Sequence, residues 1–267
     1  MPYVPTRDII TYYEEAGSGD PLVLIMGLGG DLQGWALTAP ALAKHFRVIT
    51  YDNRGAGRSG APDRPYTIAG MADDLAALLD ALDIQKANIL GFSMGGYIAQ
   101  EFALKYSGRV DRLILLSTAP GVDGYGRAVL GSWIDVQRSN LSREQLVRSR
   151  APYLYTAALL DDEERYERSV QNSVSNPYPQ QDHAFIRQAQ AILAFDASSR
   201  LGNIKADTCI LTGKDDILVP PRNSEKLNKL IADSKLQVLE GAHLGCIEYP
   251  NEYNATILEF LGVAVPA

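Results

Sequence analysis

The segment NILGFSMGGYIAQ, residues 88–100, carries the strongest structural signal in the sequence, because a single serine stands among three glycines. An apolar run precedes Ser93 and a helical pattern follows it, so the segment predicts a strand, a tight turn and a helix. The turn is so sharp that side chains at Gly91 and Gly95 would crowd the neighbouring strand and helix. We therefore expect the Ser93 hydroxyl to project above the sheet edge, at a helix N-terminus where free N–H groups favour negative charge.

The rest of the chain alternates buried strands with helices. Helix signals include residues 67–82, with Thr67 as a candidate N-cap. The opening residues 7–20 mix polar and apolar positions, which indicates antiparallel edge strands. This order predicts an α/β fold with a mostly parallel central sheet flanked by helices. The predicted buried strands are residues 21–27, 46–52, 87–93, 110–118, 207–213 and 236–241.

One segment interrupts the alternation. Residues 121–200 carry helical patterns and no buried-strand signal, which predicts a helical cap, or lid, inserted into a core formed by residues 1–120 and 201–267. Its aromatic side chains suggest an apolar substrate pocket, although they equally suit the internal packing of the cap. The candidate pocket residues are Trp133, Tyr125, Tyr153 and Tyr155, with Tyr178 and Phe195 as further aromatics of the segment.

Charge and composition narrow the class of partner. The formal net charge is −7, from 32 acidic and 25 basic residues, which disfavours nucleic acid and anionic membranes and points to a small-molecule substrate. We find no signal-peptide pattern and no run near the roughly 18 apolar residues of a membrane span, so we expect a cytoplasmic protein. Cys209 and Cys246 are far apart and predict packing residues, without metal or cofactor. The composition leaves monomer and homodimer equally open.

A nucleophilic serine needs a base and an acid. Among the three histidines, His243 alone directly follows a predicted strand and precedes a helix, the edge at which open α/β sheets form their sites; His45 and His183 do not. Two adjacent carboxylates, Asp215 and Asp216, follow the strand that ends at Gly213. Either carboxylate could orient the His243 imidazole so that it removes the Ser93 proton. Spacing alone leaves this choice open.

A third strand end supplies candidate oxyanion donors. The segment LVLIMGLGGD, residues 22–31, ends a strand in a glycine-rich turn. Its backbone N–H at Leu28, with Gly27 as second choice, is expected to act together with that of Met94.

A competing motif is GAGRSG, residues 55–60, which matches the dinucleotide fingerprint Gly-x-Gly-x-x-Gly. In that fingerprint the glycine loop leads straight into a helix, whereas here the proline-containing APDRPY follows. No nucleotide is therefore expected.

Taken together, these segments resemble the α/β-hydrolase superfamily over nearly the full chain. MGLGGDLQGW, YDNRGAGRSG, GFSMGG, GKDDILVP and GAHLGCIEYP occur in the order that the family shows. In the family, the triad aspartate precedes a Val-Pro pair with two residues between them, so the resemblance favours Asp216. Asp52, Arg54 and Ser59 match family positions of structural importance. The chain departs from the family where Met26-Gly27 replaces the usual His-Gly, which puts the hydrogen bonds beneath the oxyanion loop in question.

The resemblance implies a serine hydrolase without a cofactor. We expect it to cleave a carboxylic ester or lactone of a small, mainly apolar molecule through an acyl-enzyme, with Ser93, His243 and Asp216 as triad. Carbon–carbon bond hydrolases and cofactor-free haloperoxidases use the same triad and remain alternatives, as does a ligand receptor on a hydrolase scaffold. Dehalogenases and epoxide hydrolases, which carry aspartate at the elbow, are disfavoured by Ser93.

Overall fold

The computed structural model describes residues 2–264, so Met1 and residues 265–267 of the expected core lie outside it. Its centre is one eight-stranded sheet in the order β1-β2-β4-β3-β5-β6-β7-β8. The β1-β2 and β2-β4 pairs are antiparallel and the other five are parallel, which confirms the expected α/β class. The strands are β1 Tyr3–Thr6, β2 Ile9–Ala16, β3 Pro21–Ile25, β4 Arg47–Tyr51, β5 Ala87–Phe92, β6 Val110–Leu116, β7 Asp207–Gly213 and β8 Lys235–Leu239.

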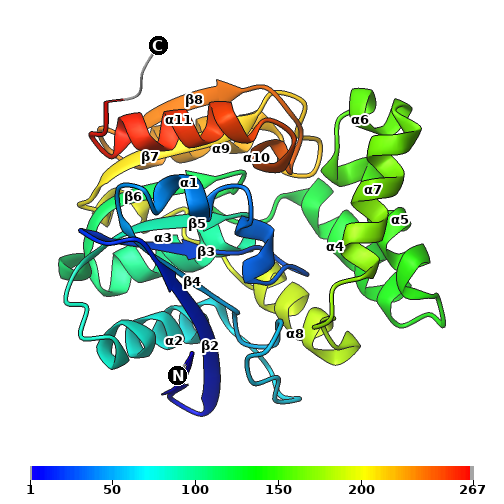
Figure 1. Ribbon diagram of the computed structural model, residues 1–267, viewed down its shortest axis with the longest axis horizontal. Helices are drawn as coiled ribbons and strands as arrows, with labels where there is room; N and C mark the ends of the chain where they lie inside the picture. Colours follow the sequence, from blue (N-terminus) through cyan, green and yellow to red (C-terminus); the bar gives the residue numbers. More distant parts are fainter. Residues whose placement is uncertain (1, 265–267) are drawn as a thin grey trace.

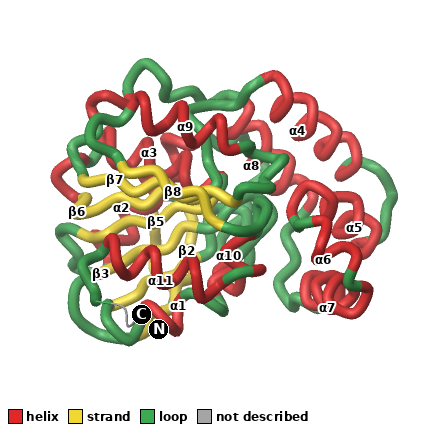
Figure 2. The backbone as a smooth tube through the Cα atoms, turned by 90° about the horizontal axis from the view of Figure 1, so that it is seen from above, coloured by secondary structure: helices red, strands yellow, loops and turns green. Residues whose placement is uncertain are grey.

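Helices cover both faces of the sheet (Figure 2). One face carries α2 Ile68–Ala81, α3 Met94–Lys105 and α9 Pro221–Leu230; the other carries α1 Ala39–Leu42 and α11 Pro250–Phe260. Helix α2 begins where the sequence predicted, because the Thr67 side chain at its N-cap accepts a hydrogen bond from the Gly70 N–H at 2.9 Å. Two apolar layers, one on each face, therefore bury the central strands completely.

Between β6 and β7 the chain forms a helical insertion, which consists of α4 Gly124–Gln137, α5 Arg143–Leu154, α6 Ala157–Asp161, α7 Glu163–Val174 and α8 Asp182–Leu193. Apart from a single bridge between Gly121 and Asp196, residues 121–200, all of them described, pair with no strand. In Figure 1 helices α4 to α7 stand beside the sheet, while α8 turns back toward it. Phe185, Ala189 and Ile192 of α8 join the core layer beneath α3.

The parallel strands set the position of the site. Because β3, β5 and β7 run in the same direction as β8, the loops that follow them emerge at one edge of the sheet. That edge faces the helical insertion (Figure 1). Among residues 2–264, no helix combines the length and the apolar character that a membrane crossing requires.

Candidate active site

Ser93 sits at a strained turn between β5 and α3, with φ 54° and ψ −116°. A Cβ atom on Gly91 would lie 2.2 Å from the Gly95 carbonyl oxygen, and one on Gly95 would lie 2.1 Å from the Ile25 oxygen. The steric reason for these glycines is therefore the one the sequence suggested. Two hydrogen bonds hold the turn: the Ser93 N–H donates to the Leu116 oxygen at 2.9 Å, and the Thr118 hydroxyl donates to the Ser93 oxygen, also at 2.9 Å.

The loop after β8 brings His243 to Ser93. Its Nε2 lies 3.0 Å from Ser93 Oγ, and its Nδ1 lies 2.8 Å from Asp216 Oδ2. An ionised carboxylate can only accept, so Nδ1 donates to Asp216, which leaves Nε2 free to accept the Ser93 hydroxyl proton. Both His243 and Asp216 are 2% exposed, so water competes little for these bonds.

Asp216 is fixed by its own turn. Its second oxygen, Oδ1, accepts hydrogen bonds from the backbone N–H groups of Leu218 at 2.9 Å and Val219 at 2.8 Å. Oδ1 therefore holds the carboxylate to its turn, while Oδ2 accepts the hydrogen bond from His243. Asp215 is exposed, and its backbone N–H donates to the Gly241 oxygen. The structure thus brings Asp216, and not Asp215, to the imidazole.

The other two histidines lie elsewhere. His45 is exposed before β4, and His183, at the start of α8, places Nε2 2.9 Å from the Ala61 oxygen. The two cysteines are buried, and burial raises the pKa of both the Cys209 and the Cys246 thiol to about 12. Their thiolates are therefore scarce at neutral pH. Across residues 2–264, three or more His, Cys, Asp or Glu side chains nowhere form a group that could hold a metal ion.

Two backbone N–H groups near Ser93 are available to a ligand. Within the described residues, those of Leu28 and Met94 donate to no protein acceptor. Met94 opens α3, where N–H groups lack intrahelical acceptors. Gly27, next to Leu28, lies against the serine, since a Cβ there would be 3.0 Å from Ser93 Cβ. Such an arrangement can bind the oxygen of a tetrahedral intermediate.

Met26 fills the space beneath this loop by packing. A Cβ on Gly34 would lie 2.2 Å from Met26 Cε, and one on Gly30 would lie 2.8 Å from its Cγ, so both glycines make room for the thioether. The Met26 carbonyl accepts a hydrogen bond from Asn53 Nδ2 at 2.8 Å. The loop thus gains an anchor, Asn53, that sequence reasoning did not single out, and Met26 itself supplies apolar contact.

The motif after β4 is structural. Buried Asp52 accepts hydrogen bonds from the N–H groups of Leu32 at 2.9 Å and Arg58 at 2.8 Å, and burial raises the pKa of its carboxyl. Ser59 Oγ donates to the Asp52 carbonyl at 2.7 Å, and Arg54 pairs with Asp74 at 2.7 Å. After residues 55–60 the next helix begins only at Ile68, so this loop lacks the context of a dinucleotide site.

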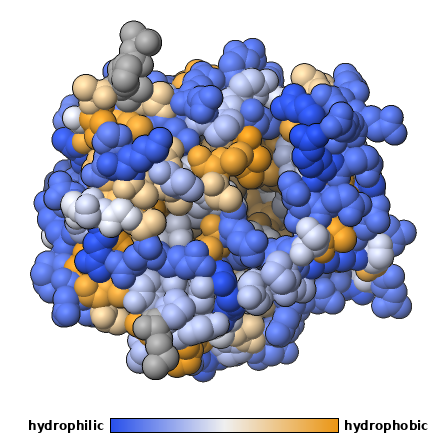
Figure 3. All heavy atoms as spheres, in the orientation of Figure 1, coloured by the Kyte–Doolittle hydropathy of each residue, from blue (hydrophilic) through white to orange (hydrophobic). Residues whose placement is uncertain are grey.

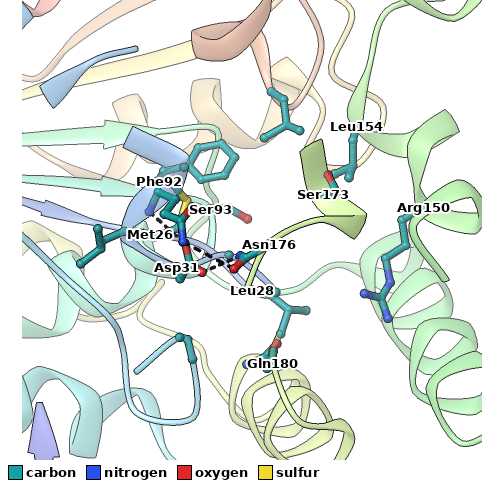
Figure 4. A pocket seen from close by; sticks show the side chains of 18 of the residues that line it. Met26, Leu28, Asp31, Phe92, Ser93, Arg150, Leu154, Ser173, Asn176 and Gln180 are labelled. Atoms are coloured by element: carbon teal, nitrogen blue, oxygen red, sulfur yellow. Dashed lines mark hydrogen bonds between the residues drawn. The ribbon is translucent and has the colours of Figure 1, made fainter. Parts of the chain in front are cut away.

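A cavity of about 1470 Å³ lies between the strand edge and the insertion. Ser93, His243 and Leu28 line it from the core side. Figure 3 shows the face hollowed at this place, with apolar residues at its rim, and Figure 4 shows the interior. The cavity exceeds the roughly 300–1,000 Å³ typical of small-molecule pockets, so a small molecule would occupy only part of it.

The aromatic residues expected in the pocket divide into two groups. Trp133 and Tyr155 line the cavity, and so does Tyr178. Tyr125 and Tyr153 are not among the residues that line it. Tyr125 is 41% exposed on the first turn of α4, and Tyr153 packs edge-on against Trp133, with ring centroids 5.8 Å apart. Phe195 packs at a tilt against Tyr97, with ring centroids 5.3 Å apart, and likewise does not line the cavity.

Polar residues of the insertion complete the lining. Gln137, Arg150 and Asn176 line the cavity. In Figure 4 Arg150 lies across the cavity from Ser93, whereas Asn176 lies beside Asp31. The sequence singles out none of them, because a polar side chain on an amphipathic helix carries no periodic signal that separates a cavity from solvent.

Comparison with known proteins agrees with this fold. The family model for the alpha/beta hydrolase fold matches residues 20–250. A relative from Azorhizobium caulinodans, named "Putative carbamate hydrolase RutD", is 33% identical across 98% of both chains. Among solved structures, the enol-lactonase from Burkholderia xenovorans LB400 superposes with a TM-score of 0.90 at 29% identity, covering 98% of this chain and 100% of that one. An esterase from Thermogutta terrifontis gives 0.85 at 26% identity, covering 98% and 97%. This chain belongs to the α/β-hydrolase family.

Proposed function

We propose that the protein is a serine hydrolase that cleaves a carboxylic ester or a lactone of a small molecule. The observation that carries this proposal is the continuous hydrogen-bond chain from Ser93 Oγ through His243 to Asp216, with distances of 3.0 and 2.8 Å. Such a chain lets a hydroxyl lose its proton as it attacks a carbonyl carbon.

The reaction has two halves. Ser93 Oγ bonds to the substrate carbonyl carbon while its proton passes to His243 Nε2, and the carbonyl oxygen becomes an anion held by the N–H groups of Leu28 and Met94. The carbon–oxygen bond to the leaving alcohol then breaks, and that alcohol takes the proton from His243. In the second half, water repeats these steps on the acyl-enzyme and releases the acid.

We further propose that residues 121–200 act as a cap over this site, on a core formed by residues 1–120 and 201–267. Two contacts support the assignment, because they join the insertion to the loops that carry the chemistry. The Leu244 N–H, next to His243, donates to the Leu154 oxygen at 2.9 Å, and Asn176 Nδ2 donates to Asp31 Oδ2 at 2.7 Å (Figure 4). A cap in this position excludes water and selects substrates by shape.

Carbamate hydrolysis is the second candidate. The 33% identical relative carries that activity in its name, and a carbamate presents the same carbonyl to Ser93. The serine, the base and the oxyanion donors would have unchanged roles, while the leaving group would differ.

The test is a panel of p-nitrophenyl acetate, a γ-lactone and an ethyl carbamate, assayed with the native protein and with Ser93→Ala. We expect multiple turnovers of the ester or lactone, loss of at least about 10⁴-fold in Ser93→Ala, and labelling of Ser93 by a fluorophosphonate probe. Preference for the carbamate would favour the second candidate. Release of about one equivalent of p-nitrophenol and no more would indicate a receptor, and full activity in Ser93→Ala would refute the proposed chemistry.

A further inference from the structure

Arg150 is a cationic side chain of the cavity that lacks an anionic partner and a backbone carbonyl partner. It projects from α5, across the cavity from Ser93 (Figure 4). Within residues 2–264 its guanidinium forms no ion pair with a carboxylate, and it donates a hydrogen bond only to Gln137 Oε1. Its Nε is buried without any acceptor. A guanidinium in such surroundings normally has an anionic partner, and Arg150 has none among residues 2–264.

The other two cavity arginines have more acceptors than Arg150. Arg143 donates to the carbonyl oxygens of Ser173 at 2.7 Å and Asn176 at 2.8 Å, and Arg58 pairs with Glu14 at 3.2 Å. Among these three, Arg150 alone has neither a carboxylate partner nor a backbone carbonyl acceptor.

The surroundings of Arg150 hold it in a fixed orientation. Its guanidinium carbon lies 4.0 Å from the Phe185 ring centroid and 5.6 Å from that of Trp133. Gln137, which accepts from Arg150, is itself fixed because its Nε2 donates to Asp182 Oδ1 at 2.6 Å. Four side chains from α4 and α8 therefore position one cation from α5, a more elaborate arrangement than internal packing of the insertion would need.

The charge persists at neutral pH. Loss of hydration on burial lowers the pKa of Arg150 to about 10, and the negative charge of Asp182 partly opposes this shift. The guanidinium stays protonated in the cell's pH range, in surroundings where water screens it weakly.

We infer that Arg150 binds a carboxylate of the substrate, so that the natural substrate is an ester or lactone that carries a free carboxylate away from its scissile carbonyl. The planar fork of a guanidinium suits a carboxylate, which can take two parallel hydrogen bonds. This inference rests on the proposed function and narrows its expected apolar substrate: the apolar walls contact the carbon chain, while Arg150 receives its charged end.

The test compares matched ester pairs that differ only in charge. Monomethyl esters of succinic, glutaric, adipic and suberic acid carry the carboxylate on the acyl side, and acetoxyalkanoates of the same lengths carry it on the alcohol side. Each is paired with its neutral carboxamide. We expect the native enzyme to prefer at least one acid over its amide by tenfold or more in kcat/KM. Arg150→Met should lower kcat/KM for that acid by roughly 30- to 100-fold and for the amide by less than about threefold, with Arg150→Lys between the two.

Arg138→Met is the matched control. Arg138 is exposed at the end of α4 beside Asp135, so its loss changes the net charge equally but should leave the acid-to-amide ratio unchanged. Absence of any acid preference in the native enzyme, or an equal loss for acid and amide in Arg150→Met, would overturn the inference and make Arg150 a structural residue of the insertion.

A binding measurement separates this inference from the proposed function. Calorimetry with the methyl ketones 5-oxohexanoate and 8-oxononanoate, which cannot be hydrolysed, and with their amides requires no turnover. If no ester is cleaved, the proposed function fails, while tighter binding of a ketoacid that Arg150→Met weakens at least tenfold still supports the carboxylate site. If no ester is cleaved and neither ketoacid binds better than its amide, both proposals fail.

Discussion

The carboxyl edge of the sheet and the helical insertion build their sides of one cavity by different means. At the edge, close backbone contacts limit which residues fit: a single methyl group on Gly95 would lie 2.1 Å from the Ile25 oxygen. In the insertion, side chains form the cavity wall and the backbone is less crowded: a Cβ on Gly131 of α4 would meet no atom within 4 Å. The edge therefore tolerates few substitutions, whereas side chains that line the cavity from the insertion can be replaced while its helices stay intact. We expect reaction chemistry to depend on the first region and substrate choice on the second.

The largest expected effect lies at the edge and separates two adjacent aspartates. Asp216→Asn should lower kcat by about 10⁴-fold, the loss that the same substitution causes in a serine-protease triad, because an amide beside Nδ1 stabilises the imidazole tautomer that cannot accept the Ser93 proton. Asp215→Asn should change kcat by less than about threefold, since Asp215 is exposed. The measurement is kcat for both variants on one ester, with thermal melting as a folding control. A severe loss in Asp215→Asn would contradict the geometry described above.

The next effect concerns stability at the same edge. Gly95→Ala should lower the free energy of unfolding by at least about 3 kcal/mol, because the new methyl group meets the backbone oxygens of Ile25 and Met26 at 2.1 and 3.0 Å and neither can move without disturbing β3. Urea denaturation of the variant and the native protein measures the difference. A loss below about 1 kcal/mol would show that the elbow relaxes more readily than its contacts imply.

These regions also differ in how well the sequence predicts them. Apolar runs predict the six parallel strands, although β8, at the edge of the sheet, is mostly not buried as expected. The glycines that a sharp turn requires predict Ser93. Both signals come from backbone geometry. His243 follows from its place after the last strand. The choice of Asp216 needs the family pattern, since Asp215 and Asp216 follow the same strand; the structure adds the reason, two N–H donors that hold Asp216 Oδ1.

The sequence predicts that the insertion is helical, but it does not predict which of its side chains line the cavity. The sequence favours Tyr125 and Tyr153 as pocket residues, yet one is exposed and the other packs on Trp133. Which face of a helix meets a cavity depends on how α4, α5 and α8 pack together, and local periodicity does not contain that information. Arg150 and Asn53 act through partners distant in sequence, so no local motif marks them.

Trp133 tests whether the insertion governs substrate choice. Trp133→Ala should lower kcat/KM for bulky neutral esters roughly tenfold more than for acetate esters, because a long chain loses apolar contact with the indole that a short chain never reaches. Tyr153→Ala is the control: this ring packs on Trp133 without lining the cavity and should affect all ester sizes equally. Equal losses across ester sizes in Trp133→Ala would mean that the indole acts only in packing.

The smallest expected effect is a gain, and it completes the glycine comparison. Gly131 lies inside α4 with open space around its Cα, so Gly131→Ala adds a methyl group that meets nothing and removes backbone freedom from the unfolded chain. The free energy of unfolding should rise by roughly 0.5 to 1 kcal/mol, with kcat unchanged. Urea denaturation beside Gly95→Ala gives the contrast directly, because the two variants add the same atom to the two regions that enclose the cavity. If Gly131→Ala instead destabilises the protein, α4 approaches another group more closely than the open space around Gly131 indicates. If it is stable but impairs turnover of bulky esters, the helix must flex at Gly131 to admit them, and the insertion would select substrates by movement as well as by its lining.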